Sequence, residues 1–92
     1  MTVPIRLPDL HAKGETIRVS SWFVEPGDEV SEGHRVVEVL LRGITFDVPS
    51  PADGVLTEIV TTVDTLIQPG DVLGWVTAAE LNRDSAEEDG ST

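Results

Sequence analysis

The chain has no cysteine, a single lysine and few aromatic side chains, and it contains no long apolar run. Without cysteine, neither a disulfide framework nor a thiolate metal site can form. No stretch approaches the roughly 18 consecutive apolar residues of a membrane-spanning helix, and the first residues lack the basic and then apolar pattern of a leader. These absences predict a soluble, cytoplasmic protein.

Positive charge is also scarce, because 17 acidic residues stand against six lysines and arginines, a net charge of -11. A chain this acidic repels nucleic acid and anionic membranes, so we expect a charged protein partner to present a basic surface. Acidic residues are dense in the segment 80–92, which has too few apolar groups to fold. We therefore expect a domain of residues 1–79 followed by a disordered acidic tail, 80–92.

Turn signals recur at short intervals and separate brief apolar stretches, which predicts an all-β sandwich or barrel. The strongest local signal is a β-hairpin in which residues 35–41 and 44–48 are strands and Arg42 and Gly43 form the turn. Gly43 suits the turn because glycine adopts a positive φ without steric cost. A chain of 92 residues can bury roughly two-thirds of its unfolded surface, enough for one core.

The sequence also contains an internal repeat. Sliding the chain by 37 residues aligns residues 22–33 with 59–70 and residues 35–39 with 72–76, so that strand, turn, short strand, turn and strand recur in the same order. Two copies are too few for a solenoid, and they favour two similar halves that face each other in a quasi-symmetric sandwich.

The apolar residues are explained by a core between two inner sheet faces. Trp22 is also a core candidate, and one or both of Trp22 and Trp75 are expected to be half exposed, because so small a sandwich has little room for two indoles. The other core candidates are Val19, Val24, Val36, Val37, Val39, Leu41, Ile44, Phe46, Val48, Val55, Leu56, Ile59, Leu66, Ile67, Val72, Leu73 and Val76.

No catalytic or metal-binding constellation is evident among the polar residues. His11 and His34 are far apart in the sequence and have no partner at metal-ligand spacing, and no serine lies in a nucleophile elbow. The aspartates occur where turns favour a side chain that bonds to nearby backbone: Asp9, Asp28, Asp53, Asp64 and Asp71. We therefore expect neither an enzyme nor a metal site.

Four segments, Leu7–Leu10, Trp22–Val30, Val48–Gly54 and Pro69–Leu73, together resemble the biotinyl/lipoyl carrier domains over residues 4–78. The resemblance is closest to the lipoyl domains of 2-oxo acid dehydrogenase acyltransferase components. It implies a flattened barrel of two four-stranded antiparallel sheets with quasi-twofold symmetry, the two chain ends on one side and the modified hairpin tip on the other.

The departure from the family falls on its attachment position. Lipoyl domains have Asp-Lys-Ala at the hairpin tip and biotinyl domains have Met-Lys-Met, whereas the aligned residues here are Arg42, Gly43 and Ile44. Glycine offers no amine, and the arginine guanidinium stays protonated and is a poor nucleophile. We therefore expect no bound cofactor and a degenerate, non-catalytic interaction module, with subunits of a dehydrogenase complex among its possible partners.

Two other hypotheses remain open. Lys13, the one lysine of the chain, lies in a loop that the resemblance places near the modified hairpin, so it could replace the lost lysine. Modified at Lys13 or by a route that the sequence does not show, the chain would then be an active carrier of lipoate or biotin for a 2-oxo acid dehydrogenase or a biotin-dependent complex. An exposed loop also accounts for a solvated lysine. A scaffold like the lysine-free segments of membrane-fusion adaptors is disfavoured, because those segments are usually split by a helical hairpin.

Overall fold

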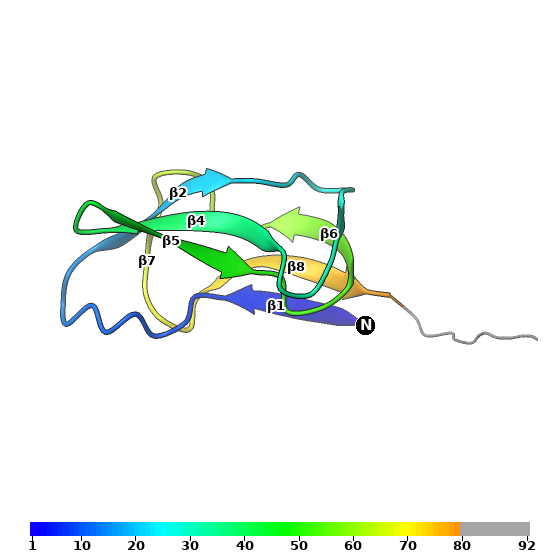
Figure 1. Cartoon of the computed structure of the whole chain (residues 1–92), viewed down its shortest axis with the longest axis horizontal. Helices are drawn as coiled ribbons and strands as arrows, with labels where there is room; N and C mark the ends of the chain where they lie inside the picture. Colours follow the sequence, from blue (N-terminus) through cyan, green and yellow to red (C-terminus); the bar gives the residue numbers. More distant parts are fainter. Residues whose placement is uncertain (80–92) are drawn as a thin grey trace, which may run out of the picture.

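In the computed structural model, residues 1–79 are described and form eight β-strands and no helix (Figure 1). The strands are β1 (Thr2–Arg6), β2 (Ile17–Trp22), β3 (Glu29–Val30), β4 (Arg35–Leu41), β5 (Ile44–Pro49), β6 (Gly54–Ile59), β7 (Leu66–Ile67) and β8 (Val72–Ala78). Nothing in this part of the chain is a helix long and apolar enough to cross a membrane. The predicted acidic tail, 80–92, lies outside the described residues.

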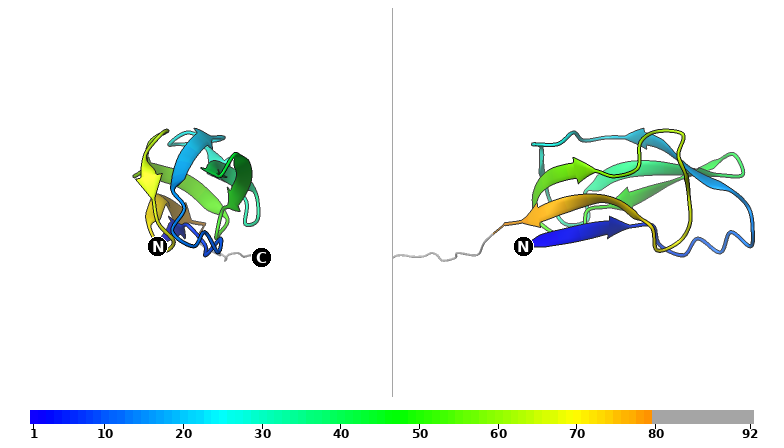
Figure 2. Two further views of the ribbon diagram at one scale, coloured as in Figure 1. Left: turned by 90° about the vertical axis from the view of Figure 1, so that its left-hand side faces the viewer. Right: turned by 180° about the vertical axis from the view of Figure 1, so that it is seen from behind.

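The strands form two four-stranded antiparallel sheets, in the orders β1-β8-β6-β3 and β5-β4-β2-β7. The predicted all-β sandwich and its central hairpin are therefore confirmed. The turn between β4 and β5 lies at one end of the molecule together with the loop 7–16, and the N-terminus lies at the other end (Figures 1 and 2). We call these the tip end and the terminal end.

The predicted repeat is visible in the backbone hydrogen bonds that join the two sheets. The amide of Gly27 donates to the carbonyl oxygen of Leu56 at 2.8 Å, and the amide of Leu56 donates back to the next residue of the same loop. Thirty-seven residues away, the amide of Asp64 donates to the carbonyl oxygen of Val19 at 2.8 Å, and the amide of Val19 donates back in the same way. Each half of the repeat is therefore bonded to the other through an equivalent pair of backbone hydrogen bonds.

The quasi-twofold symmetry between the two halves of the chain also relates β1 to β5, but their residues are separated by a number other than 37. The amides of Gly33 and Gly70, which are 37 residues apart, donate to the carbonyl oxygens of Ser50 and Leu7 respectively. These two acceptors are 43 residues apart, so the segment between β1 and β2 is six residues longer than its counterpart between β5 and β6. The extra length makes up most of the loop 7–16, and the sequence repeat alone does not reveal it.

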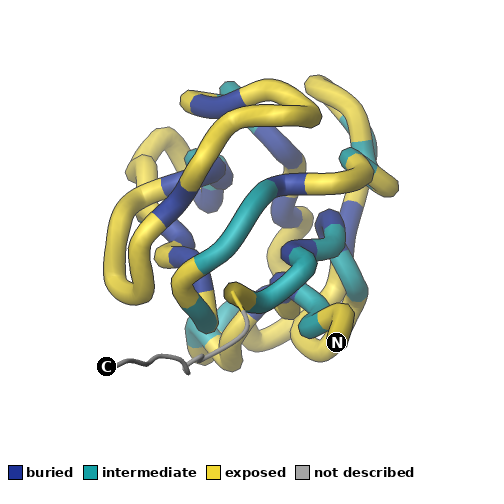
Figure 3. The backbone as a smooth tube through the Cα atoms, turned by 90° about the vertical axis from the view of Figure 1, so that its right-hand side faces the viewer, coloured by how far each residue is buried: buried dark blue, intermediate teal, exposed yellow. Residues whose placement is uncertain are grey.

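The core is almost entirely aliphatic. Figure 3 shows where its buried positions lie along the backbone. Both Trp22 and Trp75 are partly buried, as predicted. Two predicted core residues are wrong: Ile44 is 55% exposed and Leu66 is 59% exposed. The buried apolar residues are Ile5, Leu7, Ile17, Val19, Val24, Val30, Val36, Val37, Val39, Leu41, Val48, Leu56, Ile67, Leu73 and Val76, of which four had not been predicted: Ile5, Leu7, Ile17 and Val30.

The errors at Ile44 and Leu66 share a cause, which is that both residues lie on edge strands. Ile44 begins β5 beside the exposed turn, and Leu66 is the outward-facing residue of a two-residue strand. Alternation of apolar residues assigns a face of the sheet but does not reveal whether anything covers that face.

The loop between β5 and β6 is fixed by two hydrogen bonds, and Gly54, the first residue of β6, packs closely against β8. The buried hydroxyl of Ser50 donates to the carbonyl oxygen of Ala52 at 2.7 Å, and Oδ1 of Asp53 accepts the amide of Glu32 at 2.7 Å. A Cβ on Gly54 would lie 2.0 Å from the backbone oxygen of Thr77. Each polar or small residue of this loop therefore has a structural role.

We predict that Gly54→Ala destabilises the domain by about 2–3 kcal/mol, because the backbone of β8 must move to admit the methyl group. The matched control is Gly33→Ala, where the added Cβ meets nothing within 4 Å but φ is +86°. That substitution should cost about 1 kcal/mol from backbone strain alone. Urea denaturation measures both free energies, and equal losses would contradict the steric account.

Candidate functional site

The turn at the tip end contains two residues, Arg42 and Gly43, because Leu41 and Ile44 form the last pair of the β4–β5 ladder. The φ angle is +53° at Arg42 and +77° at Gly43. Two positive φ angles in a two-residue connection are typical of a type I′ turn, whose twist matches that of the strands. This geometry favours glycine at the second position and is unusual for arginine at the first.

The chemistry available at the tip is limited. Arg42, Gly43 and Ile44 are all exposed. Within residues 1–79 the guanidinium of Arg42 has no hydrogen-bond or ion-pair partner, and it is a permanent cation rather than a nucleophile. The tip can therefore supply positive charge and a small apolar contact, but it holds no group that a ligase could acylate.

Lys13 lies in a second turn of the same class. Its φ is +55°, Gly14 follows at +87°, and the amide of Glu15 donates to the carbonyl oxygen of Ala12 at 3.1 Å. The turn belongs to the loop 7–16, so it lies at the same end of the molecule as the β4–β5 turn (Figures 1 and 2). The lysine is exposed and forms no ion pair with any residue of the described domain.

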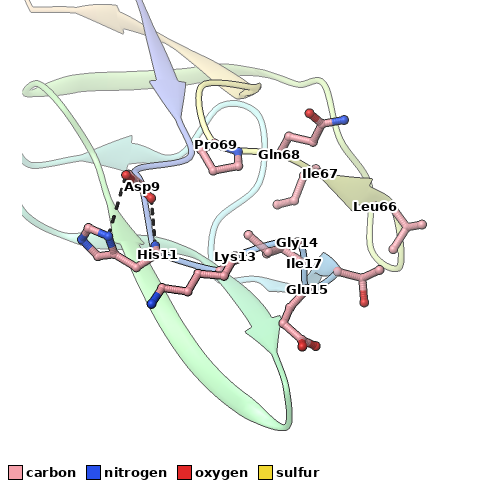
Figure 4. A pocket seen from close by; sticks show the side chains of 12 residues that line it. Asp9, His11, Lys13, Gly14, Glu15, Ile17, Leu66, Ile67, Gln68 and Pro69 are labelled. Carbon is pink, nitrogen blue, oxygen red and sulfur yellow. Dashed lines mark hydrogen bonds and ion pairs between the residues drawn. The ribbon is translucent and has the colours of Figure 1, made fainter.

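A cleft of about 630 Å³ opens between this loop and the segment that contains β7 (Figure 4). We call it the loop cleft. Its floor includes Ile17 and Ile67, which are buried, and Leu66 lines one side. The other lining residues are Asp9, His11, Ala12, Lys13, Gly14, Glu15, Thr16, Gln68 and Pro69.

The predicted roles of the polar residues are largely those of turns. Oδ1 of Asp9 accepts the amide of His11, Oδ2 of Asp28 accepts the amide of Glu25, and Oδ2 of Asp71 accepts that of Gln68, each at 2.8 Å. Two aspartates differ. The carboxylate of Asp53 bonds to the distant amide of Glu32, and Asp64 adopts a positive φ of 73°.

The two histidines do not come together at a site. His11 lies on the rim of the loop cleft with Nδ1 4.0 Å from Asp9, whereas His34 lines a different cleft near β3 and β8. Among residues 1–79, no group of three or more histidine, aspartate or glutamate side chains is arranged to hold a metal ion.

Comparison with known proteins assigns the fold to a family. The biotin/lipoyl family model, described as "Biotin-requiring enzyme", matches residues 3–76. The chain belongs to this family. Its resemblance to the carrier domains, first seen in the turn motifs, is thereby confirmed.

Within the biotin/lipoyl family, the chain is similar to acyltransferase components of two dehydrogenase complexes. It is 29% identical over 72 residues to the dihydrolipoyllysine-residue succinyltransferase component of the 2-oxoglutarate dehydrogenase complex of Buchnera aphidicola, covering 78% of this chain and 18% of that protein. It is 29% identical over 80 residues to the dihydrolipoyllysine-residue acetyltransferase component of the pyruvate dehydrogenase complex of Staphylococcus aureus, covering 87% and 19%. The chain spans about a fifth of the length of these relatives.

A solved member of the biotin/lipoyl family has the same architecture. The solution structure of the lipoyl domain of the 2-oxoglutarate dehydrogenase complex from Azotobacter vinelandii superposes with a TM-score of 0.66 at 27% identity. The match covers 82% of this chain and 95% of that domain. The two-sheet arrangement inferred for a lipoyl-like domain is therefore the one observed.

Sequence reasoning did not find the loop cleft. It singled out Lys13 but not the apolar floor beneath it, because Ile17 and Ile67 are far apart in the sequence and Leu66 was assigned to the core. The constant offset of the sequence repeat gave no signal of the longer connection before β2, which the hydrogen-bonded pairs of the structure revealed.

The positive φ of Arg42 predicts a simple gain of stability. Arg42→Asn should raise the free energy of unfolding by about 0.5–1 kcal/mol, because asparagine tolerates the left-handed region and Asn-Gly is the preferred type I′ pair. The control is Thr45→Asn, which places the same side chain in an exposed strand position and should give no gain. Equal effects of the two substitutions in urea denaturation would contradict the assigned turn geometry.

Proposed function

We propose that this chain is a lipoyl-like domain that carries no lipoyl or biotinyl group on its β4–β5 turn. The observation that carries the proposal is the Arg42-Gly43 turn, in which both φ angles are positive and neither residue has an acylable amine. In the resembling carrier domains a lysine at this tip becomes the swinging arm, since its amine is a nucleophile on a long flexible stem. The role left to the domain is a non-catalytic one, in cytoplasmic protein-protein interaction.

The proposed partners are subunits of a 2-oxo acid dehydrogenase complex or proteins that associate with one. The family and the relatives support this choice, because those relatives are components of such complexes. The charge at the terminal end favours a basic partner surface, and it disfavours nucleic acid and anionic membranes. The loops and β3 at that end carry five exposed acids: Glu25, Asp28, Glu29, Glu32 and Asp53.

A second candidate function is favoured by the geometry around Lys13. The Lys13-Gly14 turn has nearly the same φ angles as the Arg42-Gly43 turn and lies at the same end of the molecule. A lysine exposed on a tight turn is the kind of amine that an attachment enzyme acylates. In this alternative the domain is an active carrier of lipoate or biotin, and Lys13 holds the arm.

The test of covalent attachment is the intact mass of the chain after co-expression with a lipoyl ligase and lipoate, or with a biotin ligase and biotin. We expect the unmodified mass in both cases. An adduct on the wild-type chain that is absent from Lys13→Arg would overturn the proposal and establish the second candidate.

The double variant Arg42→Asp with Gly43→Lys is the positive control for that experiment. It should fold with a loss of about 1 kcal/mol, because lysine replaces glycine at a φ of +77°, and it should gain one adduct. Nothing lies within 4 Å of a Cβ at this position, so no clash opposes folding. If the folded double variant also stays unmodified, the ligase rejects the surrounding surface and not only the missing lysine.

The proposed interaction predicts that the full chain captures dehydrogenase subunits from its own host and releases them as the salt concentration rises. The variant Glu25→Lys should capture less, whereas Glu58→Lys, which changes charge equally at an exposed position of β6 away from the terminal loops, should capture as much as wild type. Quantitative mass spectrometry of the bound fraction measures this. Recovery of unrelated proteins only would reject the proposed role.

A further inference from the structure

The loop cleft exists because two segments part from each other after a short β-ladder. β2 and β7 pair through Arg18 with Leu66 and through Ile17 with Ile67, and the pairing then stops. If the pairing continued, Thr16 would lie opposite Gln68. Instead, the loop 7–16 that precedes β2 runs away from β7. The cleft occupies the space between the diverging segments (Figure 4).

The other half of the molecule provides an internal comparison. The equivalent strands β6 and β3 also diverge after a two-residue ladder, but Oδ1 of Asp53 accepts the amide of Glu32 across the gap at 2.7 Å. The residues 37 positions away are Thr16 and Pro69, and proline has no amide hydrogen to donate. The bond that joins the two sides in one half therefore cannot form in the loop cleft.

The two clefts also differ in the groups that they present. The cleft beside β3 has a similar volume, about 570 Å³, but its lining includes Gly54 where the loop cleft has Ile17, and Glu29 where the loop cleft has Leu66. The loop cleft thus combines two buried isoleucines with a leucine that is 59% exposed. An apolar side chain seated there would remove this leucine from water and would pack above isoleucines that are already buried.

Positive charge collects around the loop cleft in a molecule that is otherwise acidic. Within residues 1–79, Arg35 at the beginning of β4 pairs with Asp47 at 2.9 Å, whereas no carboxylate pairs with three other cations, which lie nearer the tip end. Those cations are Lys13, which lines the cleft, Arg18, which is cross-strand from Leu66, and Arg42, which the β2–β4 register places opposite Thr16. Two acids also line the cleft: Asp9, which accepts the amide of His11, and Glu15.

We propose that the loop cleft is a docking site for an acidic amphipathic segment of a partner protein, which inserts an apolar side chain over Ile17, Ile67 and Leu66 and places carboxylates near Lys13, Arg18 and Arg42. The proposal rests on the interaction function proposed above and adds the chemistry of the segment that is recognised. A central apolar anchor in a pocket, with charged groups at the rim, is the usual arrangement of an interface hot spot. Charge selects the partner because the three cations lie toward the tip end, whereas the five exposed acids named above are at the terminal end.

The experiment titrates the full chain with a capped eight-residue peptide, Glu-Glu-Leu-Phe-Asp-Glu-Leu-Glu, and follows amide chemical shifts by NMR. We expect saturable shifts concentrated in residues 11–17 and 66–69. Two control peptides separate the contributions of charge and apolar contact: Glu-Glu-Ser-Gly-Asp-Glu-Ser-Glu keeps the charge without the anchor, and Lys-Lys-Leu-Phe-Lys-Lys-Leu-Lys keeps the anchor with the opposite charge. Both should bind at least about tenfold more weakly.

Substitutions of single residues test whether the peptide binds in the loop cleft. Leu66→Asp, at an exposed position, and Lys13→Glu should each weaken peptide binding about tenfold without loss of fold. The matched control is Phe23→Asp, which replaces another half-exposed apolar residue, at the beginning of the loop that leads to the terminal end, and should leave the affinity unchanged.

Absence of binding, shifts outside the cleft, or equal binding of the basic peptide would overturn the proposal. Shifts of the cleft residues that depend on protein concentration without peptide would assign the cleft to a second copy of this chain and would also overturn it.

The same variants distinguish failure of this proposal from failure of the broader function. If wild-type chain captures dehydrogenase subunits and Leu66→Asp captures them equally well, the interaction function stands and the cleft is not its docking site. If the wild-type chain captures none, the broader proposal fails, whatever the peptide does.

Discussion

Four backbone hydrogen bonds between the halves are the constraint on which the rest of the structure depends. Leu56 and Val19 each donate an amide and accept with a carbonyl oxygen, and in each case the partner is a loop of the other half. These bonds fix the loops that follow β2 and β6, and thereby the positions at which β3 and β7 begin. The core can be small and purely aliphatic because the backbone supplies this connection between sheets.

Most of the fold was predictable because it is encoded in local signals. The hairpin from residue 35 to residue 48 can be predicted from two short apolar stretches and a glycine at the turn between them. The repeat can be predicted from turn residues that recur at a fixed spacing. The two-residue strands β3 and β7 show no alternation of their own, and they exist because β6 and β2 present a free edge to them. The exposure of Ile44 and Leu66 likewise depends on what lies beside them in space, which no local pattern contains.

The candidate sites were only partly predictable, for a similar reason. The residues of the tip turn, Arg42 and Gly43, were predicted directly from the sequence. The left-handed backbone of Arg42 was not, since arginine does not signal a positive φ. The loop cleft combines residues 9–17 with residues 66–69, and it became visible only once the structure brought the two segments together.

Under the quasi-twofold symmetry, the β4–β5 turn also has an equivalent position in the other half, between the end of β8 and the beginning of β1. The amide of Ala78 donates to the carbonyl oxygen of Met1 at 2.8 Å, which places this pair where Leu41 and Ile44 close the hairpin in the other half. β8 and β1 are thus arranged as a hairpin whose connecting turn is absent from the covalent chain. A two-residue linker that joins Ala78 to Met1 in place of residues 79–92, together with a cut between Arg42 and Gly43, would yield a circular permutant with the same sheets, and its free amino group and carboxylate would lie at the tip end.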